Sequence, residues 1–248
     1  MAVLVTRPEP DNETTATALR AKGLEVLLSP MLRFETVAFD IDPDARYGAV
    51  AVTSANAVRA LAGHPAEKLL LPLPLFAVGE RTAEAARQVG FQNVTAAGGD
   101  AASLLDLMTK GGRAKSLAKT RPLLYLAGAD LSRDLAGELR EHGFEVVTAT
   151  SYRMAPVADL SHAACDAFAA HRIVAVLHYS RRSARAFLDA ARAGGVEISA
   201  LAVPQCCLSD AIAAILREAG ASHVAVAAAP DESALFDAMD RALQTPSR

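Results

Sequence analysis

The chain has 248 residues, of which 52% are hydrophobic and 21% are charged. This length favours one large domain or two small ones, and the composition excludes a disordered or collagen-like chain. The 25 Lys and Arg are outnumbered by 28 Asp and Glu, which gives a net charge of −3. A protein that coats nucleic acid or an anionic membrane is not favoured, because both partners select basic chains.

The cysteine and hydropathy patterns bear on whether the protein has disulfides, a metal site, a signal peptide or a membrane span. Three cysteines do not make a disulfide framework, and the six histidines show no metal-ligand spacing, so we expect buried thiols and no metal. The beginning of the chain has no basic segment followed by a long apolar run, so we expect no signal peptide. The most apolar stretch, 69–78, is too short to span a bilayer and contains two prolines. We expect a soluble, cytoplasmic protein.

Short apolar runs alternate with Ala-, Leu- and Arg-rich helical patterns along the chain. Several runs are continuously apolar, which is typical of strands that are covered on both faces. The alternation predicts a doubly wound parallel α/β fold, and ten strands favour two sheets over one. The predicted strands are 2–6, 25–28, 48–53, 75–78, 93–96, 122–127, 145–149, 173–178, 205–208 and 223–227. The predicted helices are 11–22, 55–62, 80–89, 101–109, 131–142, 180–193, 209–219 and 231–243.

An internal repeat supports two sheets. Four segments recur in the same order at a separation of 120 to 131 residues, which chance similarity among Ala-rich helices does not explain. The pairs are 14–26 with 134–146, 52–61 with 178–187, 76–90 with 206–220, and 99–108 with 230–239. Segments 31–37 and 150–156 are extended-looking and predict strands that cross between two lobes. The basic stretch 110–122 predicts a solvated loop, with a substrate-steering patch as the alternative.

The strand-to-helix turns are the candidate binding positions. The chain contains no nucleophile elbow, no phosphate-binding P-loop and no dinucleotide glycine pattern. Its turns instead carry Ser, Thr, Gly and Asp, and in doubly wound sheets such turns lie at the carboxyl ends of the strands, where ligands bind. Helix N-termini there present free N–H groups to an anion. The alternative is that these side chains are N-caps, and both roles can coexist.

Nine segments together resemble the uroporphyrinogen-III synthase family of tetrapyrrole biosynthesis. They are LVTRP (4–8), AVTSANAVRAL (51–61), FAVGERTAEAARQVGF (76–91), GGDAASL (98–104), LLYLAGADLSRDLAGELREHGFEV (123–146), SYR (151–153), LHYSRRSARAF (177–187), CLSDAIAAILREAGASHVAVA (207–227) and PDESAL (230–235). Each motif alone is weak evidence for the family. Their joint presence in this order over nearly the whole chain is specific for it.

The resemblance implies two flavodoxin-like doubly wound lobes joined by a two-stranded connector. The first lobe would combine 1–34 with 154–248, the second would be 38–150, and the connector 35–37 and 151–153. It also implies the reaction of heme and porphyrin biosynthesis that cyclises hydroxymethylbilane to uroporphyrinogen III. Ring D is inverted and water is lost through azafulvene and spiro intermediates held in a cleft between the lobes. No metal or organic cofactor is expected. The resemblance further implies a monomer, with transient contact to hydroxymethylbilane synthase as its protein partner.

By the same resemblance Tyr152 is the proposed catalytic acid, and six residues are proposed to bind substrate at turns: Arg7, Thr53, Ser54, Thr82, Ser180 and Ser209. Structural alternatives remain open for most of them. Tyr152 could make a hydrogen bond at the lobe junction, the three serines could act only as caps, and Arg7 could pair with a carboxylate of its own lobe. We expect His178 to be a packed histidine. The alternative function is a two-lobed, non-catalytic binding or sensor module for a polycarboxylate tetrapyrrole.

Overall fold

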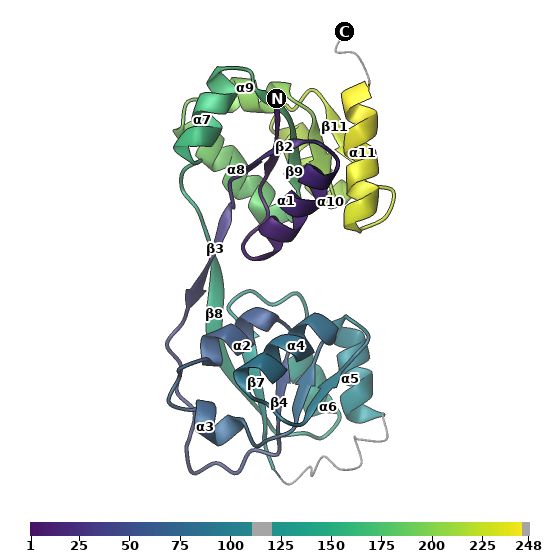
Figure 1. Ribbon diagram of the computed structural model, residues 1–248. Coiled ribbons are helices and arrows are strands. Elements are labelled where there is room, and N and C mark those ends of the chain that lie inside the picture. Colours follow the sequence, from purple (N-terminus) through teal and green to yellow (C-terminus); the bar gives the residue numbers. More distant parts are fainter. Residues whose placement is uncertain (111–120, 245–248) are drawn as a thin grey trace. The chain divides into compact units, whose positions relative to one another are not determined.

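The computed structural model describes residues 1–110 and 121–244, and the chain divides into two compact units (Figure 1). Unit 1 combines Met1–Arg33 with the chain from Ala155 onward, and unit 2 is Phe34–Met154. All ten predicted strands are present. Most of the basic stretch expected at 110–122 lies outside the described residues.

Unit 1 is built on a five-stranded sheet in the order β2-β1-β9-β10-β11, with parallel pairing throughout. Its strands are β1 (Ala2–Val5), β2 (Glu25–Leu28), β9 (Ile173–His178), β10 (Gln205–Cys207) and β11 (Val224–Val226). Its helices are α1 (Asp11–Ala21), α7 (His162–Ala169), α8 (Arg181–Ala193), α9 (Glu197–Ala202), α10 (Asp210–Glu218) and α11 (Glu232–Gln244).

Unit 2 is built on the sheet order β3-β8-β7-β4-β5-β6. Its strands are β4 (Ala49–Val52), β5 (Leu75–Ala77), β6 (Val94–Ala96), β7 (Leu123–Gly128) and most of β8 (Val146–Pro156), together with the end of β3 (Leu32–Thr36). Its helices are α2 (Ala55–Leu61), α3 (Glu67–Leu70), α4 (Glu80–Val89), α5 (Ala101–Thr109) and α6 (Leu135–Glu141). Strands β8, β7, β4, β5 and β6 pair in parallel.

Strands β3 and β8 contain the two points where the chain passes from one unit to the other. The N–H of Val37 donates to the carbonyl of Ser151, and the N–H of Val157 donates to that of Met31, so the two strands run antiparallel. The separately predicted segments 145–149 and 150–156 form one continuous strand, β8.

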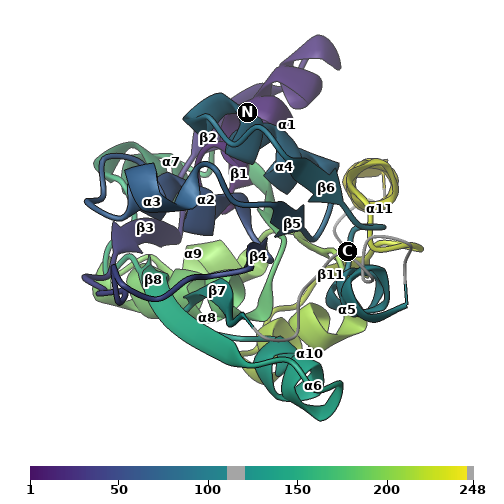
Figure 2. The same cartoon turned by 90° about the horizontal axis from the view of Figure 1, so that it is seen from below.

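Each sheet has a hydrophobic core on both faces, which explains why its strands are continuously apolar. In β1, Leu4 faces the core under α7, α8 and α10, whereas Val3 and Val5 face the core under α1 and α11. In unit 2, α2, α3 and α4 cover one face and α5 and α6 cover the other (Figure 2). The adjacent thiols of Cys206 and Cys207 divide between the two cores of unit 1, as expected for neighbours on a strand.

The two sheet orders are equivalent under the sequence repeat. Matching β1 with β7, β2 with β8, and β9, β10 and β11 with β4, β5 and β6 superimposes one order on the other. The repeated segment 14–26 lies in unit 1, while its counterpart 134–146 lies in unit 2. Each unit therefore combines the first βαβ segment of one repeat copy with the remaining strands of the other.

Sequence patterns missed three short helices and misplaced one boundary. Helices α3, α7 and α9, of four, eight and six residues, were not predicted. The helix predicted from 131 begins at Leu135 instead, because the Asp134 carboxylate accepts a hydrogen bond from the N–H of Gly137 at 2.9 Å and acts as the N-cap.

Candidate functional site

The predicted turn residues follow neighbouring parallel strands within each unit. In unit 1, Arg7 follows β1, Ser180 follows β9 and Ser209 follows β10, and these three strands are adjacent in the sheet. In unit 2, Thr53 and Ser54 follow β4, and Thr82 lies in the helix after β5. Parallel strands end at the same edge, so each unit collects its predicted residues at the carboxyl edge of its own sheet.

Unit 2 contains a cavity of about 380 Å³ at this edge, and two of the predicted residues line it. Thr53 contributes a hydroxyl from the end of β4, and Tyr152 contributes a phenol from β8. A third hydroxyl comes from Tyr125 in β7, whose oxygen lies 3.1 Å from Thr53 Oγ1. The full lining is Thr53, Val78, Gly99, Asp100, Ala101, Tyr125, Gly128, Asp130, Leu131, Ser132, Arg133, Leu135 and Tyr152.

Tyr152 is half-buried and held by its ring. The ring stacks on Phe34 with centroids 6.0 Å apart and an interplanar angle of 25°. Its main chain is fixed as well, because the N–H of Ala129 donates to the Tyr152 carbonyl at 2.8 Å. Tyr125 is almost fully buried, and this burial raises the pKa of its phenol. Both phenols are thus presented to the cavity from strands, which hold side chains more firmly than loops do.

The charged residues around the cavity have structural partners. Arg133 makes a two-pronged ion pair with Glu138, at 2.6 Å from Nε and 2.6 Å from Nη2. Asp100 caps α5 by accepting the N–H of Ser103 at 2.7 Å, and the hydrogen bonds from Ser103 lower the pKa of that carboxyl. Tyr152, Tyr125 and Thr53 then supply neutral hydroxyl groups to a ligand in the cavity.

The serine turns differ in their use of the hydroxyl group. Ser54 accepts from the N–H of Asn56 at 3.2 Å, and Ser180 accepts from that of Ser183 at 3.0 Å, so both are N-caps. Ser209 occupies the N-cap position of α10, but within the described chain its side chain makes no capping bond. Ser54 and the buried Thr82 are not among the residues that line the unit 2 cavity.

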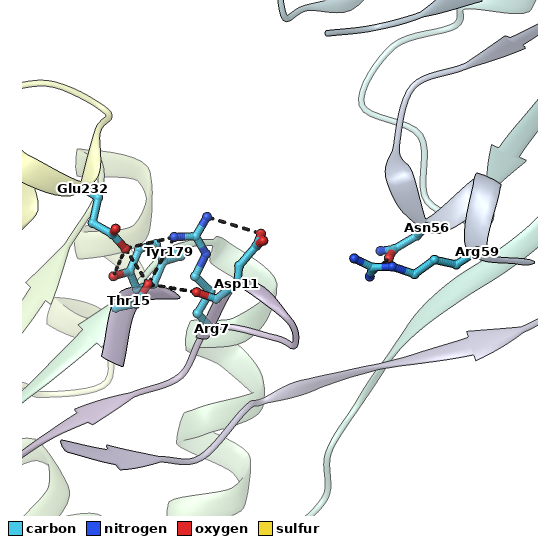
Figure 3. A network of polar contacts seen from close by, with 7 residues as sticks. All are labelled: Arg7, Asp11, Thr15, Asn56, Arg59, Tyr179 and Glu232. Carbon is cyan, nitrogen blue, oxygen red and sulfur yellow. Dashed lines mark hydrogen bonds and ion pairs between the residues drawn. The ribbon is translucent and has the colours of Figure 1, made fainter. Parts of the chain in front are cut away.

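Arg7 belongs to a polar network within unit 1 (Figure 3). It pairs there with carboxylates of its own unit, which is the alternative to substrate binding given above. Its guanidinium lies 3.0 Å from Glu232 Oε1 and 3.3 Å from Asp11 Oδ2, and it stacks over the ring of Tyr179 at 4.7 Å. The same oxygen of Glu232 accepts hydrogen bonds from the hydroxyls of Thr15 and Tyr179. We call these five residues the Glu232 network. A substrate carboxylate would have to share Arg7 with two carboxylates already present.

His178 is a packed histidine, as expected. It is fully buried at the end of β9, and its Nε2 lies 2.9 Å from Gln205 Oε1. The amide nitrogen of Gln205 donates to the carbonyls of Ala200 and Val203, so its oxygen must accept and His178 must carry its proton on Nε2. Burial lowers the pKa of His178 to about 4, because the charged imidazolium would lose its hydration there.

Metal sites and membrane spans are both absent from the described part of the chain. Within 1–110 and 121–244, no three His, Cys, Asp or Glu side chains gather in a way that could hold a metal ion. Over the same ranges no helix combines the length and apolar character needed to cross a bilayer. Burial raises the pKa of both Cys206 and Cys207 to about 12, so neither thiol is activated.

Sequence reasoning missed two residues of these sites, Tyr125 of the cavity and Glu232, the partner of Arg7. Tyr125 lies in an otherwise apolar strand, where its phenol is the one side chain able to form a hydrogen bond, and that contrast was the available signal. Glu232 begins α11, 225 residues from Arg7 in the chain. No local pattern links such distant positions.

Solved uroporphyrinogen-III synthases share the architecture of this chain. The solved uroporphyrinogen-III synthetase from Helicobacter pylori 26695 is 20% identical, with a TM-score of 0.62, over 95% of this chain and 96% of that one. A mutant uroporphyrinogen III synthase from the extremely thermophilic bacterium Thermus thermophilus is 17% identical, with a TM-score of 0.51, over 98% and 99%. At these identities the likeness establishes the fold. No curated protein sequence matches the chain.

A sequence model of the family described as uroporphyrinogen-III synthase HemD matches residues 13–237. The chain therefore belongs to the uroporphyrinogen-III synthase family, and the resemblance drawn from its motifs is confirmed. Family membership also confirms the expected activity, the enzymatic cyclisation of hydroxymethylbilane in porphyrin and heme biosynthesis.

Proposed function

We propose that the chain closes hydroxymethylbilane with inversion of ring D, and that Tyr152 assists the first step as a general acid. In that step the C–O bond of the terminal hydroxymethyl group breaks as the pyrrole nitrogen lone pair forms the azafulvene. The departing hydroxide takes the proton of the acid and leaves as water, and the N–H proton of the same pyrrole passes to the phenolate, which leaves a neutral azafulvene. The substituted carbon of ring D then attacks the azafulvene carbon to form the spiro intermediate.

The observation that carries this proposal is the position of Tyr152 in the wall of the unit 2 cavity. At about 380 Å³ the cavity lies at the small end of ligand sites, which suits one pyrrole ring better than a whole tetrapyrrole. The hydroxyls of Tyr125 and Thr53 line the same space and can orient the ring by hydrogen bonds. Holding one reacting end in a single orientation favours the inverted product over random closure.

Substrate carboxylates are proposed to bind at the turns of both units. The proposed ligands are Arg7, Thr53, Ser54, Thr82, Ser180 and Ser209, with helix N-termini supplying further N–H donors. Ser209 is supported by its side chain, whose hydroxyl is not committed to capping α10. For Ser54 and Ser180 the capping bonds show a structural role, and the binding role stays a prediction.

The finer architecture is also proposed. We infer that each unit is a flavodoxin-like lobe, with lobes at 1–34 plus 154–248 and at 38–150, and that 35–37 and 151–153 are a two-stranded connector. The order β2-β1-β9-β10-β11 supports this view, because it is the 2-1-3-4-5 order of flavodoxin-like sheets. A monomeric state, transient contact with hydroxymethylbilane synthase and a cytoplasmic location stay predictions. Family membership favours the enzyme over the non-catalytic binding module.

The test is a coupled assay that supplies hydroxymethylbilane and separates the type III and type I products. Tyr152→Phe keeps the ring that stacks on Phe34 and removes only the hydroxyl. We expect kcat to fall about ten- to a hundredfold, or about 1.4–2.7 kcal/mol, with little change in KM.

The matched control is Tyr47→Phe, because Tyr47 is buried in the same unit and does not line the cavity. Full kcat in Tyr152→Phe would remove the acid role. Accumulation of type I product alone by the unaltered protein, at the rate seen without it, would refute the synthase activity itself.

A further inference from the structure

Tyr152 follows an irregularity in the pairing of β8 with β7. Ala127 pairs with Thr150, but the next residue of β7, Gly128, pairs with Tyr152, so Ser151 is one extra residue in β8. Ser151 is fully buried, and its hydroxyl donates to the carbonyl of Ala127 at 3.3 Å. An extra residue of this kind is a β-bulge, which exchanges the faces to which the following side chains point.

The side chains of β8 show this exchange. Before the bulge, Val147 and Ala149 pack in the core under α2, α3 and α4, whereas Val146 packs in the opposite core. Strict alternation would send Tyr152 to the face of Val146. Tyr152 instead packs against the core of Val147 and Ala149. The bulge therefore decides on which face of the sheet the phenol lies.

Gly128, the strand partner of Tyr152, leaves the space that the phenol occupies. A Cβ atom built on Gly128 would lie 2.7 Å from Tyr152 Cζ and 2.8 Å from its hydroxyl oxygen. Both distances are far shorter than the 3.5–4.0 Å or so of a favourable contact. Gly128 is not among the residues with a positive φ, so its backbone accepts alanine. The ring, as the end of a side chain, would have to move away.

We propose that Gly128 and the Ser151 bulge are positioning elements for the Tyr152 hydroxyl. The bulge selects the face of the sheet, and Gly128 leaves room for the phenol against β7, in the wall of the cavity. Neither residue is assigned a contact with the reacting atoms. The functional consequence rests on the proposed acid role of Tyr152, whereas the placement of the phenol can be measured independently of it.

Gly128→Ala tests the proposal, because it displaces the phenol without removing it. We expect kcat to fall about tenfold or more, as in Tyr152→Phe, with KM changed less than about threefold. The control is Gly194→Ala, where the added Cβ would meet Cys165 Sγ at 3.2 Å. This position is in unit 1, whereas the cavity is in unit 2. That control should keep kcat.

A double-mutant cycle separates positioning from general damage. If Gly128 acts through the hydroxyl, Gly128→Ala combined with Tyr152→Phe should lose no more activity than Tyr152→Phe alone. If the fold-losses in activity of the two single variants multiply in the double variant, the proposal is overturned, because Gly128 then acts independently of the Tyr152 hydroxyl. Full kcat in Gly128→Ala beside an impaired Tyr152→Phe would overturn it as well.

A spectroscopic readout keeps the two proposals distinguishable. The chain has four tyrosines, so ¹³Cζ labelling gives four resonances, and Tyr152→Phe identifies the one from Tyr152. Gly128→Ala should shift that resonance and leave those of Tyr47 and Tyr179 unchanged. An unshifted Tyr152 resonance would refute the positioning role, whatever the kinetics. A fully active Tyr152→Phe enzyme with a shifted resonance in Gly128→Ala would refute only the acid role.

Discussion

His178 makes the stability of unit 1 depend on pH in a way that the structure predicts in sign and size. Its side chain is fully buried, its Nε2 proton is donated to Gln205, and its Nδ1 atom has no hydrogen-bond partner among the described residues. Burial lowers its pKa from 6.5 to about 4. This difference corresponds to about 3 kcal/mol between the two protonation states.

The sign follows from proton binding. Above pH 6.5 the imidazole is neutral in both the folded and the unfolded chain, so the full contribution to stability is present. Between about 6.5 and about 4 the unfolded chain binds the proton and the folded chain does not. The free energy of unfolding must therefore fall by about 1.4 kcal/mol per pH unit across this interval, by about 3 kcal/mol in total.

The assay compares the wild type with His178→Gln by urea unfolding at a series of pH values between about 7 and about 4. Hydrogen exchange of peptides from β9 assigns the transition to unit 1. We expect the wild type to lose about 3 kcal/mol more than the variant over this range, because carboxylates titrate equally in both. His162→Gln is the control, since this histidine is exposed in the same unit. Parallel curves for wild type and His178→Gln would refute the reasoning.

Two further predictions concern unit 1. Ser180→Ala should cost about 0.5–2 kcal/mol of unfolding free energy by loss of the α8 cap, whereas Ser209→Ala should cost little and raise KM if Ser209 binds substrate. Denaturation and steady-state assays check both, and equal costs would contradict the capping difference. Glu232→Gln should cost about 1–3 kcal/mol and lower KM, because Arg7 is then shared with one carboxylate fewer. An unchanged KM would leave Arg7 a structural residue.

Local patterns in the sequence were sufficient for the elements of the fold. Each of the ten predicted strands is present, because a strand covered on both faces must be apolar throughout and its run is bounded by turn residues. N-cap chemistry is equally local: Ser54 and Ser180 lie just before helices and accept the N–H groups expected of them. The short helix α3 was not predicted, because a single helical turn shows no hydrophobic periodicity.

The site depended on contacts between distant segments. Thr53 and Tyr125 are 72 residues apart and form a hydrogen bond because β4 and β7 are adjacent strands. Arg7 and Glu232 meet because α11 packs on the sheet that contains β1. Motifs placed Thr53 and Arg7 at strand ends and Tyr152 on the connector, but they did not show which of these residues share a cavity or an ion pair.

The sequence by itself determined the strands and most of the helices, the repeat and, through its motifs, the family, because these depend on neighbouring residues and on their order. The repeat alone left open whether its copies exchange their first βαβ segments, which the family resemblance implied, and only the tertiary structure decided toward which face Tyr152 points. The repeat is equally compatible with pairing inside or between copies, since equivalent strands present similar apolar surfaces. The bulge at Ser151 depends on the register of β8 against β7, and one extra residue leaves no trace in the hydrophobic pattern.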